Sequence, residues 1–192
     1  MVFKLMIGMT GTGYMIKETI DILKELQDEF GEDISVTVML SNEGVAVVKW
    51  YKQWLYLTET VKKVHIEKTP NIPFFAGALQ IGKYDMFICS PVSANSVAKI
   101  VHGIADTLIT NSVAQAIKGG VTVHIFPSDQ DFEPIVTSKP NGEPLVLKIR
   151  DIEIENVEKL KKLEGIYVIK SFSDIKKLIL DKIKEKSQNP EY

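Results

Sequence analysis

The sequence contains very little cysteine and arginine. Cys89 and Arg150 are the only residues of their kinds in a chain of 192 residues. A single cysteine excludes an internal disulfide, a cysteine-rich zinc site and an iron–sulfur cluster held by this chain alone. Because Arg150 is the one arginine among 23 basic residues, bidentate arginine clamps are almost absent. Any phosphate group must therefore be bound mainly by other groups.

Long hydrophobic runs and a strong excess of charge are also missing. No stretch reaches the roughly 18 uninterrupted apolar residues of a membrane span, so none is expected. The net charge of -2 and the pI of about 6.0 argue against the basic surface that nucleic-acid binding requires. The apolar stretch 1–9 is followed at once by threonines and glycines, which is not typical of a signal peptide. We therefore expect a cytoplasmic protein.

The apolar residues that are present alternate between strand and helix patterns. Strands are predicted at residues 2–9, 34–40, 84–89 and 121–126, with a weaker one at 61–66. Helices are predicted at residues 16–30, 43–57, 74–81, 93–103 and 106–118. This alternation indicates an α/β fold: a doubly wound, mostly parallel sheet with helices on both faces.

The last third of the chain has a different pattern. Pro140, Asn141 and Gly142 form a turn signal between two apolar runs, which predicts a hairpin. A charged helix, a short strand at residues 166–169 and an amphipathic helix at 173–186 follow. We expect one domain over residues 1–192, with a core at 1–130 and an extension of hairpin and helices at 131–192. Whether the hairpin is a lid or an oligomer contact stays open.

Small polar residues and glycines follow three of the predicted strands. Thr10, Gly11, Thr12 and Gly13 follow the first strand, Ser41 the second, and residues 93–96 the third. In an open parallel sheet, ligands bind where strands end and helices begin. Glycines let the backbone approach a phosphate at a helix start. The glycine pattern of dinucleotide-binding proteins is incomplete, because its third glycine is missing. No acidic residue stands at Ser41 to bind a ribose hydroxyl. A phosphate group or the edge of a flavin is therefore favoured as the ligand.

The third of these segments holds more polar groups than one helix start needs. Ser93 is a good N-cap, but one cap does not explain the further amide and hydroxyl groups of Asn95 and Ser96. Ala94 is small and lets another surface come close. We therefore favour ligand binding over capping alone as the role of residues 93–96.

The run PVSANSVAKIVHGIADTL resembles the PASANT-type motif of the FMN-binding flavoprotein family. That family includes homo-oligomeric flavin-containing cysteine decarboxylases, flavin prenyltransferases, archaeoflavoproteins and dihydromethanopterin reductases. The resemblance extends over about the first 130 residues. It implies a flavodoxin-like or Rossmann-like fold and non-covalent FMN at a subunit interface of a trimer or dodecamer. Outside the motif the chain looks most like the archaeal redox members.

The resemblance also implies particular cofactor-binding residues. The family's first flavin loop is matched by residues 10–13, the hydroxyl after the second strand by Ser41, and a later contact by Ser128. Residues 93–96 match the segment that contacts the cofactor phosphate and ring. The full predicted set is Thr10, Gly11, Thr12, Gly13, Ser41, Ser93, Ala94, Asn95, Ser96 and Ser128. No catalytic residue is assigned, and no metal site is predicted.

Two departures from the family pattern bear on the chemistry. Ala76 lies near the position of the decarboxylases' catalytic histidine, and the segment FPSDQDFEP lacks their Met-Asn pair. Decarboxylation is therefore not expected, and Arg150 alone fits a prenyl phosphate poorly. The remaining prediction is an FMN-dependent oxidoreductase that passes electrons from a separate ferredoxin-like donor to a small acceptor such as dihydromethanopterin. The alternatives are an FMN-binding electron carrier without its own substrate, a decarboxylase-like enzyme, and a nucleotide-binding module without flavin.

Two further features are given structural interpretations. Trp50 and Trp54 lie four residues apart in a predicted helix and should share one face, which favours a core or subunit contact over a flavin wall or a docking patch. Cys89 ends a buried strand without basic neighbours in sequence, so we expect an inert thiol.

Overall fold

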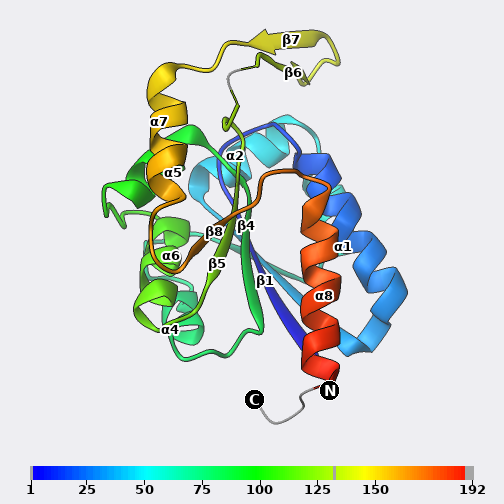
Figure 1. The fold of residues 1–192 in the computed structure, drawn as a ribbon. Coiled ribbons are helices and arrows are strands. Elements are labelled where there is room, and N and C mark those ends of the chain that lie inside the picture. The colour runs from blue at the N-terminus through cyan, green and yellow to red at the C-terminus, as the bar shows by residue number, and fades with distance from the viewer. Residues whose placement is uncertain (1, 132, 189–192) are drawn as a thin grey trace.

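The computed structural model describes residues 2–131 and 133–188 and has a six-stranded parallel sheet at its centre (Figure 1). The strands are β1 (Phe3–Met9), β2 (Ile34–Leu40), β3 (Lys63–Ile66), β4 (Met86–Val92), β5 (Val123–Pro127) and β8 (Ile166–Val168). Their order across the sheet is β3-β2-β1-β4-β5-β8, and every neighbouring pair is parallel. The predicted doubly wound α/β fold is confirmed.

Helices cover both faces of this sheet (Figure 1). One face packs against α1 (Ile16–Phe30), α2 (Asn42–Trp50), α3 (Trp54–Thr60) and α8 (Asp174–Gln188), with the short 3-10 helix η1 (Gly31–Asp33) after α1. The other face packs against α4 (Phe75–Gln80), α5 (Ala94–Val101), α6 (Leu108–Lys118) and α7 (Asp151–Leu160). Two separate apolar clusters result, one on each side of the sheet.

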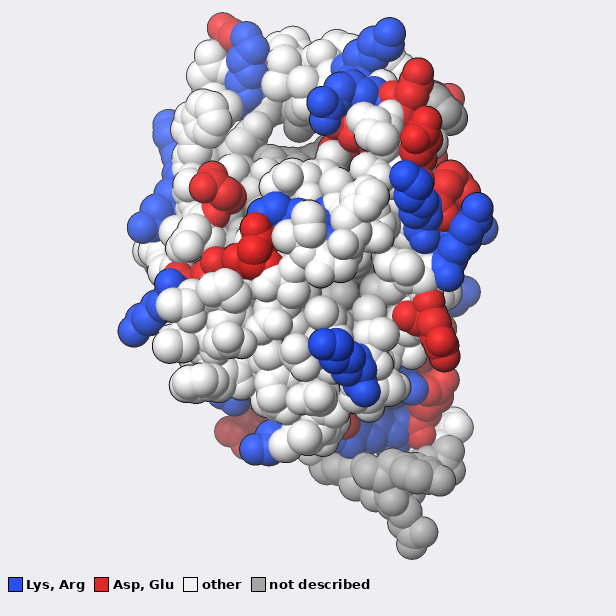
Figure 2. Space-filling view, turned by 90° about the vertical axis from the view of Figure 1, so that its left-hand side faces the viewer, with Lys and Arg blue, Asp and Glu red and all other residues white. Residues whose placement is uncertain are grey.

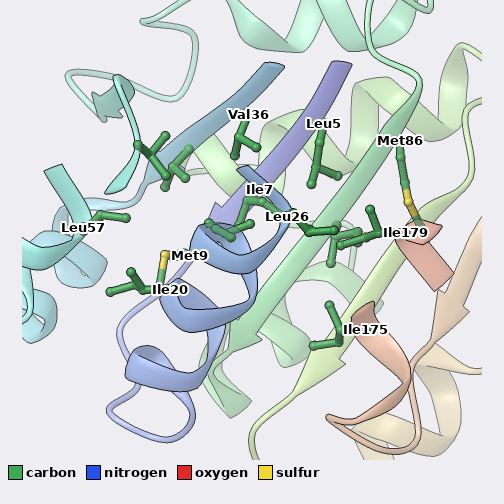
Figure 3. Packing of buried hydrophobic residues seen from close by; sticks show 14 of the residues in the cluster. Leu5, Ile7, Met9, Ile20, Leu26, Val36, Leu57, Met86, Ile175 and Ile179 are labelled. Carbon is green, nitrogen blue, oxygen red and sulfur yellow. The ribbon is translucent and has the colours of Figure 1, made fainter. Parts of the chain in front are cut away.

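The alternation of side chains along β1 shows how one strand serves both clusters. Leu5, Ile7 and Met9 point into the cluster with α1 and α8, where Ile20 and Ile179 pack against the sheet (Figure 3). Met6 points into the opposite cluster. Because a strand places successive side chains on opposite faces, a nearly continuous apolar sequence predicts a strand covered on both sides. The structure confirms this for β1.

The predicted helix at residues 43–57 is two helices. α2 ends at Trp50, Lys52 has a φ of 59°, and α3 begins at Trp54. The prediction that Trp50 and Trp54 share one helix face is therefore wrong. Trp50 is 68% exposed, whereas Trp54 packs against the core. A left-handed lysine interrupts the helix without any glycine or proline signal, so sequence periodicity could not reveal the break.

The strand predicted at residues 84–89 starts two residues later and continues to Val92. Ser90 therefore lies inside β4 rather than at a helix start. Its side chain is fully buried, and its Oγ lies 3.3 Å from Thr19 Oγ1 as a hydrogen-bond partner. Cys89 is also fully buried, and burial raises the pKa of its thiol far above the ordinary value. The prediction of an inert thiol is confirmed in this respect.

The predicted hairpin is present as β6 (Ile135–Ser138) and β7 (Pro144–Leu147) and stands beyond the carboxyl edge of the sheet (Figure 1). Gly142 in its turn has a φ of 88°, a conformation that favours glycine. Val136 and Val146 are cross-strand partners and are 70% and 63% exposed. Within residues 2–131 and 133–188, no helix combines the length and apolar character needed to cross a membrane.

Candidate functional site

The strand order reverses between β1 and β4, and two predicted segments meet there. From β1 the chain builds β2 and β3 on one side and then returns to β4 on the other. Thr10 follows β1 and Ser93 follows β4. The backbone N–H of Ser93 donates to Thr10 Oγ1 at 2.8 Å, and the N–H of Thr10 donates to the carbonyl of Pro91 at 3.2 Å. The two loops therefore lie at the point of the carboxyl edge where α/β proteins bind ligands, and we call this region between them the crevice.

The hydroxyl of Thr10 is used within the protein. Thr10 is 2% exposed, and its Oγ1 both accepts from Ser93 and donates to the Pro91 carbonyl at 3.4 Å. These bonds join loops 83 residues apart in sequence. Thr10 therefore positions the two loops relative to each other.

The glycine loop lies against α2 and the turn after it. A Cβ on Gly11 would come within 2.7 Å of the Cβ of Glu43, and a Cβ on Gly13 would overlap the ring of Tyr51. Neither glycine has a positive φ. Close packing, rather than an unusual backbone conformation, therefore requires glycine at both positions. Thr12 is half-buried, and its Oγ1 accepts weakly from the backbone N–H of Tyr14 at 3.4 Å.

The start of α2 lies beside the end of β1. Ser41 caps the helix, since its Oγ accepts from the N–H of Gly44 at 3.0 Å. Its own N–H donates to the carbonyl of Met9 at 3.2 Å, and the residue is 6% exposed. The predicted contact Ser41 thus lies next to the glycine loop. Both form part of one wall of the crevice.

At the start of α5, residues 93–96 combine capping with an accessible surface. Ser93 is the N-cap, and its Oγ accepts from the N–H of Ser96 at 3.3 Å. Ser96 is 8% exposed, Ala94 is half-buried and Asn95 is exposed. The capping interpretation is therefore correct for Ser93. It leaves Ala94 and Asn95 available at the crevice.

Ser128 and a carboxylate missed by the sequence interpretation complete the crevice. The N–H of Ser128 donates to the carbonyl of Val92 at 2.8 Å, which joins the end of β5 to that of β4. The Ser128 hydroxyl and the backbone N–H of Ala94 both favour the charged form of the Asp129 carboxylate. Burial raises the pKa of Asp129, and Glu153 on α7 raises it further. The only sequence signal for Asp129 was its place directly after Ser128.

The raised pKa of Asp129 gives a prediction for stability against pH. Burial favours the neutral form, so the folded protein holds this proton more tightly than the unfolded chain, where the pKa is near 3.8. At a pH above the raised pKa, the charged carboxylate therefore lowers the free energy of unfolding. At a pH below the pKa of the unfolded chain, the carboxyl group is protonated in both states and this loss is absent. We expect Asp129→Asn to be more stable than wild type at about pH 7, with the difference vanishing near about pH 3. Urea denaturation of wild type and variant across this pH range measures the difference in stability. A variant less stable than wild type at neutral pH would contradict the prediction.

A cavity of about 690 Å³ opens beside this crevice, between the carboxyl ends of the strands and the hairpin. Phe126, which is 3% exposed, lines it together with Tyr14 and Phe172, and its ring centroid lies 6.5 Å from that of Tyr14 and 5.4 Å from that of Phe172. Asp131 and Glu133 also line it. Burial raises the pKa of the Tyr14 phenol, with Glu18 and Asp131 adding to the effect. The cavity therefore offers aromatic surface together with hydrogen-bond acceptors.

These groups fit a flavin mononucleotide. Close-packed glycines and hydroxyl-capped helix starts supply N–H groups suited to a phosphate without requiring arginine. The aromatic cavity supplies the apolar surface that a flavin ring requires. No group of three or more potential metal ligands occurs among residues 2–131 and 133–188.

The fold is that of an α/β protein whose carboxyl sheet edge is suited to a phosphorylated cofactor. The sequence model of the family described as Flavoprotein matches residues 2–191, so the chain belongs to that family. The predicted family and its flavin cofactor class are thereby confirmed. The assignment of individual cofactor contacts stays a prediction.

Three similar proteins extend this comparison. An uncharacterised protein of Methanocaldococcus jannaschii is 45% identical over 94% of this chain and 96% of its own length. The dihydromethanopterin reductase (acceptor) of the same organism is 39% identical over 68% of this chain, but the match spans only 55% of that enzyme. The crystal structure of Burkholderia xenovorans DmrB with FMN, described as a cubic protein cage for redox transfer, is 27% identical with a TM-score of 0.80, covering 96% and 97% of the two chains.

Proposed function

We propose that this protein is an FMN-dependent oxidoreductase that passes electrons to a small acceptor of the dihydromethanopterin type. The observation that carries the proposal is the hydrogen bond from Ser93 to Thr10, which unites the glycine loop with the PVSAN segment beside an aromatic cavity. Support comes from the flavoprotein family match, the FMN complex of DmrB and the similarity to dihydromethanopterin reductase.

In this proposal the predicted residues divide into two groups. Thr10, Gly11, Thr12, Gly13 and Ser41 form the loops on the β1 and β2 side of the cofactor, and residues 93–96 contact its phosphate and ring, with Ser128 as a further contact. The N–H of Ala94 favours the charged form of the Asp129 carboxylate, so a negative charge stands near that end of α5. Bound flavin supplies one-electron and two-electron transfer. The chain's residues orient it and exclude water.

The acceptor would enter the cavity of about 690 Å³. The partly buried rings of Tyr14 and Phe172 offer surfaces for a planar ring, and Asp131 and Glu133 can accept hydrogen bonds from ring N–H groups. The electrons would come from a separate ferredoxin-like protein, because Cys89 alone holds no cluster. A decarboxylase is not proposed, since the residue near the catalytic histidine position is Ala76, which is 6% exposed in α4.

We propose further that the protein is a homo-oligomer, for which a trimer and a dodecamer are the expected forms. Figure 2 looks onto the side of α4 to α7 and shows a wide surface with few charges. Ile81 after α4 and Ile104 after α5 are 67% and 47% exposed. Exposed apolar side chains on a weakly charged surface are typical of subunit contacts. Light scattering of the purified protein tests this.

The function is tested by the visible spectrum and by turnover. The purified protein, or the protein after addition of FMN, is expected to show a flavin spectrum and to release FMN on denaturation. Under anaerobic conditions, the reduced protein is then mixed with dihydromethanopterin. Reoxidation of the flavin with formation of the tetrahydro product supports the enzyme. Reoxidation only by other redox proteins would instead indicate an electron carrier, and a protein unable to bind FMN would contradict the proposal.

A further inference from the structure

A second cavity, of about 380 Å³, lies on the other edge of the sheet, away from the crevice. Its floor includes residues from the amino ends of the strands: Lys4 of β1 is the register partner of Ser35 of β2, and Lys63 opens β3. Phe75 of α4 and Tyr84, just before β4, form its walls. None of these residues belongs to the cofactor site described above.

The cavity carries uncompensated positive charge. Lys4, Lys63 and Lys83 line it, and no aspartate or glutamate does. Among residues 2–131 and 133–188, none of the three lysines forms an ion pair. The Nζ of Lys63 donates to Ser35 Oγ at 2.8 Å. The carboxylate of the nearby Asp85 forms an ion pair with Lys186 Nζ at 2.6 Å. It also accepts a hydrogen bond from the backbone N–H of Lys4 at 2.6 Å. Three lysines around one cavity without an acidic residue in its lining favour an anion.

Aromatic groups stand beside these lysines. The ring of His65 meets Phe75 edge-on, with centroids 4.8 Å apart, and both line the cavity. Phe74 lines the same cavity and is 77% exposed. Burial and the charge of Lys63 lower the pKa of His65, which favours the neutral ring, and a neutral ring can pack against another ring. A planar ring would therefore find apolar surface next to the cationic groups.

We propose that this cavity binds a small phosphorylated aromatic molecule of the nucleoside monophosphate class. The ammonium groups of Lys4, Lys63 and Lys83 bind the phosphate, and Phe75 and Tyr84 contact the base. The cavity volume lies within the range of small-molecule sites. No bond is made or broken in this step, and the proposal stands independently of the proposed redox function.

The test uses FMN-saturated protein with AMP as the probe and NMR of the histidine ring protons as the readout. AMP is expected to shift the His65 signals and to raise its pKa, because a phosphate near Lys63 favours the protonated ring. His102 is exposed and serves as the internal reference. Lys63→Gln is expected to weaken AMP binding by about tenfold or more, since a charge-assisted bond is lost. Lys177→Gln, an exposed change on α8, is the matched control.

Four outcomes would overturn the proposal. They are an absence of His65 shifts at millimolar AMP, equal affinity of wild type and Lys63→Gln, release of FMN by AMP, and inorganic phosphate binding as tightly as AMP. Adenosine without phosphate is expected to bind more weakly than AMP. Because Lys63 is exposed, an unchanged melting temperature and FMN content would show that the variant has kept its fold.

Discussion

Replacing Gly44 with alanine is expected to lower the free energy of unfolding by about 1–3 kcal/mol and to abolish tight FMN binding. The added Cβ would lie 2.6 Å from the carbonyl oxygen of Met9. That oxygen cannot easily move, because it ends a central strand and accepts from the N–H of Ser41 at 3.2 Å. α2 must therefore shift away from β1, which opens the wall next to the glycine loop. Urea denaturation and FMN titration measure the two effects.

Gly77→Ala is the matched control for this prediction. Gly77 lies in the helix α4, and a Cβ there would meet nothing within 4 Å. Alanine restricts the unfolded chain and favours helix, so this variant is expected to gain about 0.5–1 kcal/mol and to keep its affinity for FMN. Equal stabilities of the two variants would show that the close contact between α2 and β1 does not constrain the fold.

Replacing Thr10 with valine is expected to cost about 1–3 kcal/mol of stability and to weaken FMN binding. Valine fills nearly the same volume but removes the oxygen that accepts from the N–H of Ser93 at 2.8 Å. Thr10 is 2% exposed, so water cannot readily replace that acceptor. The half-buried N–H of Ser93 then loses its protein acceptor, and the loops after β1 and β4 lose this bond.

Thr10→Ser separates this effect from a loss of packing. Serine keeps the hydroxyl and removes only a methyl group, so most of the stability and the FMN affinity should remain. Thermal melts without FMN measure the change in stability, and fluorescence titration with FMN measures the change in cofactor affinity. A valine variant as stable as the serine variant, with equal FMN affinity, would exclude a positioning role for the hydroxyl.

The alternation of strands and helices was predictable because local patterns encode it. The apolar run ending at Met9 and the helical spacing from Ile16 to Phe30 each identify an element without reference to the rest of the chain. The break at Lys52 was not predictable, since a single left-handed lysine leaves helical periodicity nearly intact. The extension of β4 to Val92 was missed because proline is usually a sign that a strand has ended.

The candidate site shows the same division. Glycines, serines and threonines at strand ends marked the right loops, because parallel sheets bind ligands where strands end. Sequence alone could not show that Thr10 and Ser41 also form hydrogen bonds within the protein. It also gave little reason to select Asp129, which is brought close to the start of α5 only when β4 and β5 pair.

The sequence by itself determined the class of fold, the family and the loops that form the crevice. These properties depend on residue type and local spacing, which the chain carries before it folds. Only the tertiary structure decided which polar groups are free and which are already satisfied, where the two cavities lie, and which lysines have no acidic partner. Such properties depend on distances between segments far apart in sequence, for example the 83 residues between Thr10 and Ser93, and folding alone sets those distances.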